Sequence, residues 1–155
     1  MQLSPRAFYF LVKNYEQKEK EVRKMEIRNL TPHDIVLLRE DEKGDVVGVV
    51  GFPPRETRCS VVATLPSEGV ARATQKSVIS GMLEVEGFQV PIKDVEFGEP
   101  ENLPAPEPGV LLVVSTLTAQ AAKKHGRATD DLLCATDTVR DERGRVLGCL
   151  AFSRV

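Results

Sequence analysis

The stretch Gly109–Gly126, GVLLVVSTLTAQAAKKHG, contains the clearest fold signal in the chain. Its apolar run, Val110 to Val114, predicts a strand that is buried on both faces. The alanine-rich segment that follows, Leu117 to His125, predicts a helix that ends at Gly126. A buried strand that runs directly into a helix is an α/β unit, and we expect the rest of the fold to be organised around it.

The chain from Met25 onward is otherwise typical of short strands separated by turns. The expected strands are Ile35 to Leu38, Val46 to Val50, Cys59 to Leu65, Val70 to Ala73, Met82 to Val85, Phe88 to Ile92, Leu132 to Ala135, Thr138 to Arg140 and Arg145 to Phe152. We expect Ile35–Leu38 to pair with Val46–Val50 in a hairpin, and a second hairpin to turn at Glu86–Gly87. Pro91 indicates an edge strand there.

The first residues predict a helix from Pro5 to Lys24. Ser4 is suited to the N-cap position and Pro5 to the first helical position. Four apolar residues then follow at helical spacing, namely Phe8, Leu11, Val12 and Tyr15. The predicted fold class is therefore α+β, with a mixed, mainly antiparallel sheet, one central strand–helix unit and an additional N-terminal helix.

The residues before Met25 also suggest a later start of the gene. Lys20-Glu21-Val22-Arg23 can be encoded by AAG GAG GTG AGG, which contains a ribosome-binding sequence at about the usual distance from a start codon. On this hypothesis residues 25–155 form a single domain, and the helix over residues 1–24 lies upstream of the native start. The DNA sequence tests it, because synonymous codons without GGAGG would exclude it.

Composition limits the class of protein. The chain has 155 residues, 41% hydrophobic and 28% charged, which suits one globular domain with its own core. A net charge of -2 argues against a general nucleic-acid-binding surface. Three scattered cysteines indicate a reducing compartment, and no apolar run approaches the length of a membrane span. With no signal-peptide pattern, we expect a cytoplasmic protein that does not bind membranes.

The segment Gly98–Gly109, GEPENLPAPEPG, predicts an extended connector that delivers the chain to the central strand, because its four prolines exclude a helix or a ladder. A ligand for a proline-recognition domain is the alternative. The absence of flanking basic residues argues against it.

Four motifs resemble a family of small uncharacterised proteins from bacteria, their phages and archaea. The motifs are Asn29-Leu30-Thr31-Pro32-His33, Pro66-Ser67-x-Gly69-x-Ala71-Arg72, Gly98-x-x-x-x-Leu103-Pro104 leading to Gly109–Ser115, and Val139-Arg140-Asp141-x-x-Gly144-Arg145-Val146-x-Gly148. The resemblance covers Met25 to Phe152 and departs from the family in a long insert, Gly51 to Val61. It implies one compact domain and no particular activity.

The best candidate site is the start of the predicted helix. Ser115, Thr116, Thr118 and Gln120 would present hydroxyl, amide and backbone N–H groups where a helix dipole favours an anion. Arg72 and Arg140 are the candidate counter-charges for a phosphate. The alternative is structural, because every helix start favours a serine or threonine as its N-cap.

His33 is the candidate catalytic residue, since histidine exchanges protons near neutral pH. The alternative is that Thr31 and His33 only stabilise a turn. No metal site and no cofactor is predicted, because the cysteines form no C-x-x-C pair. Ser115 lacks the G-x-S-x-G pattern that exposes a nucleophilic serine. His125 falls in the last helical turn, where a cation complements the dipole.

Two functions therefore remain open from the sequence. The first is a domain that binds, and in one version cleaves, a nucleotide or other phosphorylated small molecule at Ser115–Thr116, with His33 as acid–base group. The second is a non-enzymatic interaction module, including a homo-oligomer, that uses sheet edges and the N-terminal helix. The absence of an acid–base pair favours the second function, and the hydroxyls at the strand-to-helix turn favour the first.

Overall fold

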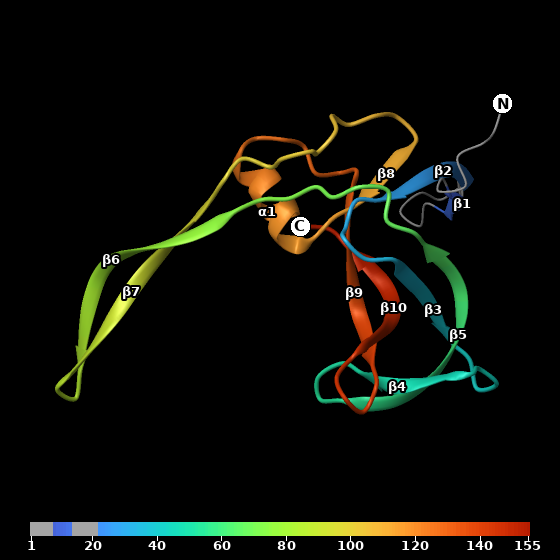
Figure 1. Cartoon of the computed structure of the whole chain (residues 1–155), viewed down its shortest axis with the longest axis horizontal. Coiled ribbons are helices and arrows are strands. Elements are labelled where there is room, and N and C mark those ends of the chain that lie inside the picture. The colour runs from blue at the N-terminus through green and yellow to red at the C-terminus, as the bar shows by residue number, and fades with distance from the viewer. Residues whose placement is uncertain (1–7, 14–21) are drawn as a thin grey trace.

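The computed structural model describes residues 8–13 and 22–155 (Figure 1). These residues form ten strands and one helix of nine residues, so the fold is mainly β and the α+β prediction is wrong. The elements are β1 (Phe8–Lys13), β2 (Val22–Asn29), β3 (Ile35–Glu40), β4 (Val46–Val50), β5 (Arg55–Leu65), β6 (Gln75–Val85), β7 (Phe88–Phe97), β8 (Val110–Val113), α1 (Thr116–Lys124), β9 (Leu132–Arg140) and β10 (Val146–Ser153).

The predicted N-terminal helix is replaced by strands. β1 pairs antiparallel with β2, in a register that runs from Phe8 opposite Ile27 to Lys13 opposite Val22. The run Phe8–Val12 consists of five consecutive aromatic and aliphatic residues, which suit a strand better than a one-sided helix once a partner strand is present. The other positions of the prediction, 1–7 and 14–21, lie outside the described residues.

The predicted strand–helix unit is confirmed by β8 and α1. β8 pairs in parallel with β2 on one side and with β9 on the other, and α1 connects β8 to β9. All five residues of Val110–Val114 are buried. Val110, Leu112 and Val114 pack with the helix residues Ala119 and Ala122, whereas Leu111 and Val113 pack with Ile27 and Leu65 on the opposite face. In the described part of the chain, no helix combines the length and apolar character needed to cross a bilayer.

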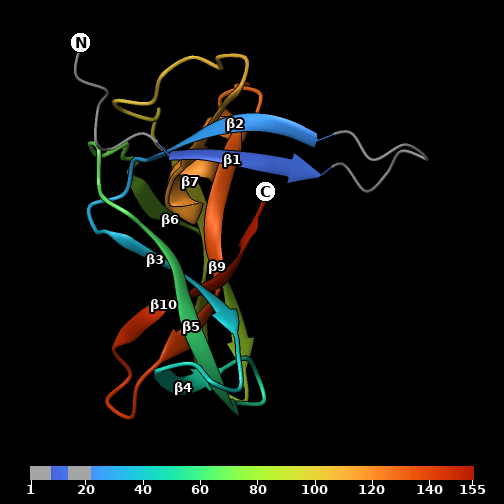
Figure 2. The same cartoon turned by 90° about the vertical axis from the view of Figure 1, so that its right-hand side faces the viewer.

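Strands β9, β10, β3, β5 and β4 form a closed ring below this sheet (Figure 2). The ring closes where Val49 of β4 pairs with Arg140 of β9. Gly48 makes this closure possible, since a Cβ there would lie 2.6 Å from the Arg140 carbonyl oxygen. The interior is filled by Leu38, Val50, Cys59 and Val139.

The predicted hairpin between β3 and β4 is wrong. Both strands pair with β5 instead, on its two edges, and Cys59 lies opposite Glu40 of β3 and Val46 of β4. The long strand β5 therefore lies between two strands that are consecutive in sequence. The chain between β3 and β4 crosses from one edge of β5 to the other, because β5 lies between these two strands in the closed ring, which we call the barrel.

Strands β6 and β7 form a separate two-stranded arm that projects from the body (Figure 1). The predicted turn at Glu86–Gly87 is confirmed, and the strands extend well beyond the predicted segments to Gln75 and Phe97. At the base of the arm, the Gly98 N–H donates to the Thr74 carbonyl at 2.8 Å. The arm therefore leaves and rejoins the body at one place.

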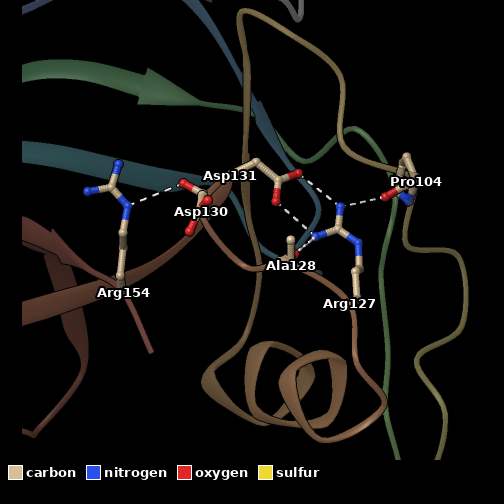
Figure 3. A network of polar contacts seen from close by, with 6 residues as sticks. All are labelled: Pro104, Arg127, Ala128, Asp130, Asp131 and Arg154. Carbon is tan, nitrogen blue, oxygen red and sulfur yellow. Dashed lines mark hydrogen bonds and ion pairs between the residues drawn. The ribbon is translucent and has the colours of Figure 1, made fainter.

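The proline-rich crossover before β8 is fastened by an arginine (Figure 3). The Arg127 guanidinium donates to both carboxylate oxygens of Asp131, at 2.8 and 2.9 Å, and to the carbonyl of Pro104 at 2.7 Å. Arg127 and Asp131 are both largely buried, so this bidentate pair is well shielded from water. It ties the loop that follows α1 to the crossover that precedes β8.

Candidate functional site

A pocket of about 490 Å³ lies where the start of α1 meets the barrel. It is lined by His33 from the β2–β3 connection, by Ser115 and Thr116 from the start of α1, and by Cys134 and Cys149 from β9 and β10. The fold thus brings three of the predicted site residues, His33, Ser115 and Thr116, to one cavity. Apolar side chains of β3 and β10, together with Val114 directly after β8, complete much of the wall.

Ser115 is the N-cap of α1. Its backbone is extended, with φ -66° and ψ 152°, and its hydroxyl accepts a hydrogen bond from the Thr118 N–H at 3.2 Å. The Ser115 carbonyl accepts the first intrahelical bond from Ala119. The structural alternative for Ser115 therefore holds, since its oxygen already serves the helix. The N–H groups of Thr116 and Leu117 precede the intrahelical ladder and point out of the helix start.

Thr118 has a structural role as well. Its side chain is fully buried, shares a 2.8 Å hydrogen bond with the Ser115 hydroxyl, and donates to the Ala71 carbonyl at 3.3 Å. Thr118 does not line the pocket. It holds the first turn of α1 against the segment between β5 and β6.

Thr116 is exposed at the pocket and contacts one of its thiols. Burial raises the pKa of the Cys134 thiol, and a hydrogen bond with the Thr116 side chain acts in the opposite direction. Burial likewise raises the pKa of the Cys149 thiol. Both cysteines are therefore protonated at neutral pH and behave as pocket wall, because the thiolate is the reactive form.

His33 is held in place by the buried side chain of Asn29. The Asn29 amide donates to the carbonyls of His33, at 2.8 Å, and of Leu65, at 2.9 Å. Its oxygen accepts from the N–H and the hydroxyl of Thr31, at 2.9 and 2.7 Å. The nitrogen and the oxygen of this buried amide each take part in two hydrogen bonds. These bonds fix the turn at His33, which lies at the rim of the pocket.

A second segment supports the same turn. The Ser67 hydroxyl donates to the Thr31 carbonyl, and the Ser67 N–H donates to the Asp34 carboxylate at 3.1 Å. The Ala71 N–H donates to the Leu30 carbonyl at 3.0 Å. The motifs around Asn29 and Ser67 therefore form the frame of the pocket, and the predicted alternative, in which Thr31 stabilises the His33 turn, agrees with these hydrogen bonds. In the sequence, the only sign of this frame is the presence of polar residues, among them Thr31 and Ser67, at positions typical of turns.

The other predicted site residues lie elsewhere. Gln120 is exposed on α1 beside Phe97, Lys123 and Lys124, and does not line the pocket. Arg140 lies at the far end of the barrel, where its guanidinium donates to the Gly144 carbonyl at 3.0 Å. The backbone of Arg72 pairs with that of Glu101. These residues are not gathered around one ligand.

The polar chemistry of the pocket is limited. Its charged or ionisable side chains are His33, Asp34, Cys134 and Cys149, and its described lining contains no lysine or arginine. Within the described residues, no group of three or more His, Cys, Asp or Glu side chains is arranged to hold a metal ion. The arrangement therefore suits recognition of one polar end of a ligand, with apolar walls for the remainder.

No family model, no curated protein and no solved structure matches this chain.

Proposed function

We propose that this chain is a binding domain for a phosphorylated small molecule, whose anionic end lies against the start of α1 and whose remainder occupies the pocket. The observation that carries the proposal is the convergence of Ser115, Thr116 and His33 on one cavity. A helix start attracts an anion through its free N–H groups and its dipole. The walls of the pocket enclose a space of ligand size, which a helix start alone does not provide.

The walls indicate what kind of molecule fits. Ile35, Val36, Val114 and Leu147 offer apolar surface beside the polar rim of His33 and Thr116. A ligand with a flat or apolar body and a single anionic group, such as a nucleotide, matches this division. The absence of lysine and arginine from the described lining favours a ligand of low charge, so monophosphates and cyclic nucleotides should bind better than triphosphates.

The experiment compares two substitutions at one position. Thr116→Asp places a negative charge in the first turn of α1, where it stabilises the helix and repels an anion. Thr116→Asn is the matched control, because asparagine has nearly the same shape as aspartate and carries no charge. We expect wild type and Thr116→Asn to gain thermal stability with mononucleotides and cyclic nucleotides, and Thr116→Asp to gain none while remaining folded.

Two outcomes would contradict the proposal. Binding that persists unchanged in a folded Thr116→Asp protein would place the ligand elsewhere. No stabilisation of wild type by any member of a panel of mono-, di- and cyclic nucleotides and sugar phosphates would remove its basis. Cleavage is tested in the same mixtures by chromatography, with His33→Gln expected to retain binding and to lose any turnover.

The second candidate is a non-enzymatic interaction module. It is favoured by apolar side chains that are exposed far from the pocket, on the β6–β7 arm. Since the described residues of the predicted N-terminal helix, 8–13 and 22–24, form strands, this candidate depends on strands rather than on helix docking.

A further inference from the structure

The β6–β7 arm exposes a row of apolar side chains on one face. Residues directly opposite each other in an antiparallel pair lie on the same face, and successive residues alternate. Leu83 lies opposite Val90, and Val85 lies opposite Phe88. The extra residue Ser80 shifts the register, so that Gly81 lies opposite Ile92. We call this the apolar face; it comprises Val78, Gly81, Leu83, Val85, Phe88, Val90 and Ile92, and Asp94, opposite Val78, lies on the same face at its end nearest the body.

The opposite face of the arm is mixed. It pairs Met82 with Pro91, Ile79 with Lys93, and Glu84 with Gln89. In the described chain β6 and β7 pair only with each other, and α1 meets the arm at its base, where the His125 ring lies 2.9 Å from the Phe97 carbonyl oxygen. A lone two-stranded ribbon is marginally stable in water, and its exposed apolar side chains add to that cost.

We propose that the apolar face packs against the same face of a second copy of this chain, with the two arms antiparallel around a twofold axis. The inference concerns residues remote from the pocket and does not depend on a ligand there. Leu83 is 53% exposed and Phe88 is 74% exposed. Together, the side chains of the apolar face expose on the order of 500 Å² of apolar surface per arm. Two such faces bury about 1,000 Å² together, the lower limit for a specific interface.

The sizes of the side chains favour this antiparallel arrangement. With the axis at the level of Met82, the large pair Leu83–Val90 of one copy faces the Gly81–Ile92 pair of the other. Gly81 leaves room there, since a Cβ would meet only Ile92 Cδ1 at 3.8 Å. The large side chain of Leu83 thus lies against the small Gly81, as in a packed core, and Val90 lies against Ile92. Because of the twofold axis, each of these contacts occurs twice in the dimer.

The decisive test compares two neighbouring residues with the same exposure. Leu83 and Met82 are each 53% exposed, and they lie on opposite faces of the arm. We expect sedimentation equilibrium of the full chain to give a dimer for wild type and for Met82→Lys, and a monomer for Leu83→Lys. Neither residue belongs to the core clusters of the body, so thermal melts should confirm that both variants are folded.

A second variant tests the register. Gly81→Leu adds only apolar atoms, and in the isolated arm its Cβ would make an ordinary van der Waals contact of 3.8 Å with Ile92 Cδ1. In the proposed dimer those atoms meet Leu83 of the partner copy, so we expect the dimer dissociation constant to rise about tenfold. A wild-type monomer at all concentrations overturns the proposal. A dimer that survives Leu83→Lys, or one that Met82→Lys disrupts equally, also overturns it.

Discussion

The buried amide of Asn29 donates a hydrogen bond of 2.8 Å to the backbone carbonyl of His33, four residues further along the chain. Asn29→Ala would remove the amide partner of the Leu65 carbonyl and of the Thr31 N–H, and would leave the His33 carbonyl with the Thr31 hydroxyl, at 3.0 Å, in place of the amide. We expect the free energy of unfolding to fall by about 1 to 3 kcal/mol, measured by urea denaturation.

Thr31→Val is the control for this prediction. It removes one hydroxyl from the same network and leaves the bonds of the Asn29 amide to His33 and Leu65 in place. A loss on Asn29→Ala no larger than that on Thr31→Val would mean that the amide does not organise the turn.

Leu112 tests the central strand. Its side chain is 2% exposed and packs with α1 on one face of β8. We expect Leu112→Ala to lower the free energy of unfolding by about 2 to 5 kcal/mol, because it leaves a cavity between sheet and helix. Val62→Ala on β5 is the control, with 55% exposure and an expected loss within about 0.5 kcal/mol. Equal losses at the two sites would argue against β8 as the centre of the core.

A shortened chain that begins at Met25 tests the proposed late start. This chain lacks β1 and the first residues of β2, but keeps the pairing of Glu26–Asn29 with β8. Ile27, on the retained part of β2, is buried against Leu65 and Leu111. We therefore expect a cooperative melt with little change in melting temperature. A loss of several degrees, or association of the shortened chain, would show that β1 is required.

Acid should weaken the turn between β9 and β10. Hydrogen bonds from the Arg145 and Arg143 N–H groups, together with the Arg145 side chain, lower the pKa of Asp141 below its ordinary value of 3.8. A lowered pKa in the folded state means that the carboxylate stabilises the fold above pH 3.8. This stabilisation is lost as the pH falls through the lowered pKa of the folded protein.

We expect Asp141→Asn to melt lower than wild type at neutral pH, with the difference shrinking once the pH is well below 3.8. Glu142→Gln removes the same charge from the exposed neighbouring residue. If the two variants show the same pH dependence, the effect is one of net charge and not of the Asp141 turn.

The β8–α1 unit could be predicted because two independent signals coincide there. Val110–Val114 is apolar at every position, which only burial on both faces explains, and Ser115 follows as a helix cap. The N-terminal segment offered no such agreement. Phe8, Leu11 and Val12 fit a helical spacing, but the intervening Tyr9 and Phe10 are equally compatible with a strand, and pairing with β2 decides.

The barrel could not be read from local patterns, since its closure depends on contacts between distant strands. Consecutive strands usually pair, which is why β3 and β4 were expected to form a hairpin. Cys59 lies opposite both Glu40 and Val46, so β5 intervenes, and nothing in the short loop before β4 signals this.

The site was predictable only in part. Ser115 and Thr116 were found from the chemistry of a helix start, and His33 from its exposed turn. Asn29 was missed because a polar residue at the end of a strand looks like an ordinary turn residue. Three of its four hydrogen bonds are indeed local, to Thr31 and His33, and only the bond to Leu65 depends on the fold. Arg140 and Arg72 were grouped with the site by charge alone, and charge carries no information about distance.

The bond from the Gly98 N–H to the Thr74 carbonyl at the base of the arm makes residues 75–97 a self-contained insertion. The body closes on itself at this point, so a tight turn could replace the whole arm, and an unrelated module could be grafted in its place, without disturbing strand order. A protein with this architecture can therefore change the length of its arm, and with it the partner that the arm binds, without changing the pocket.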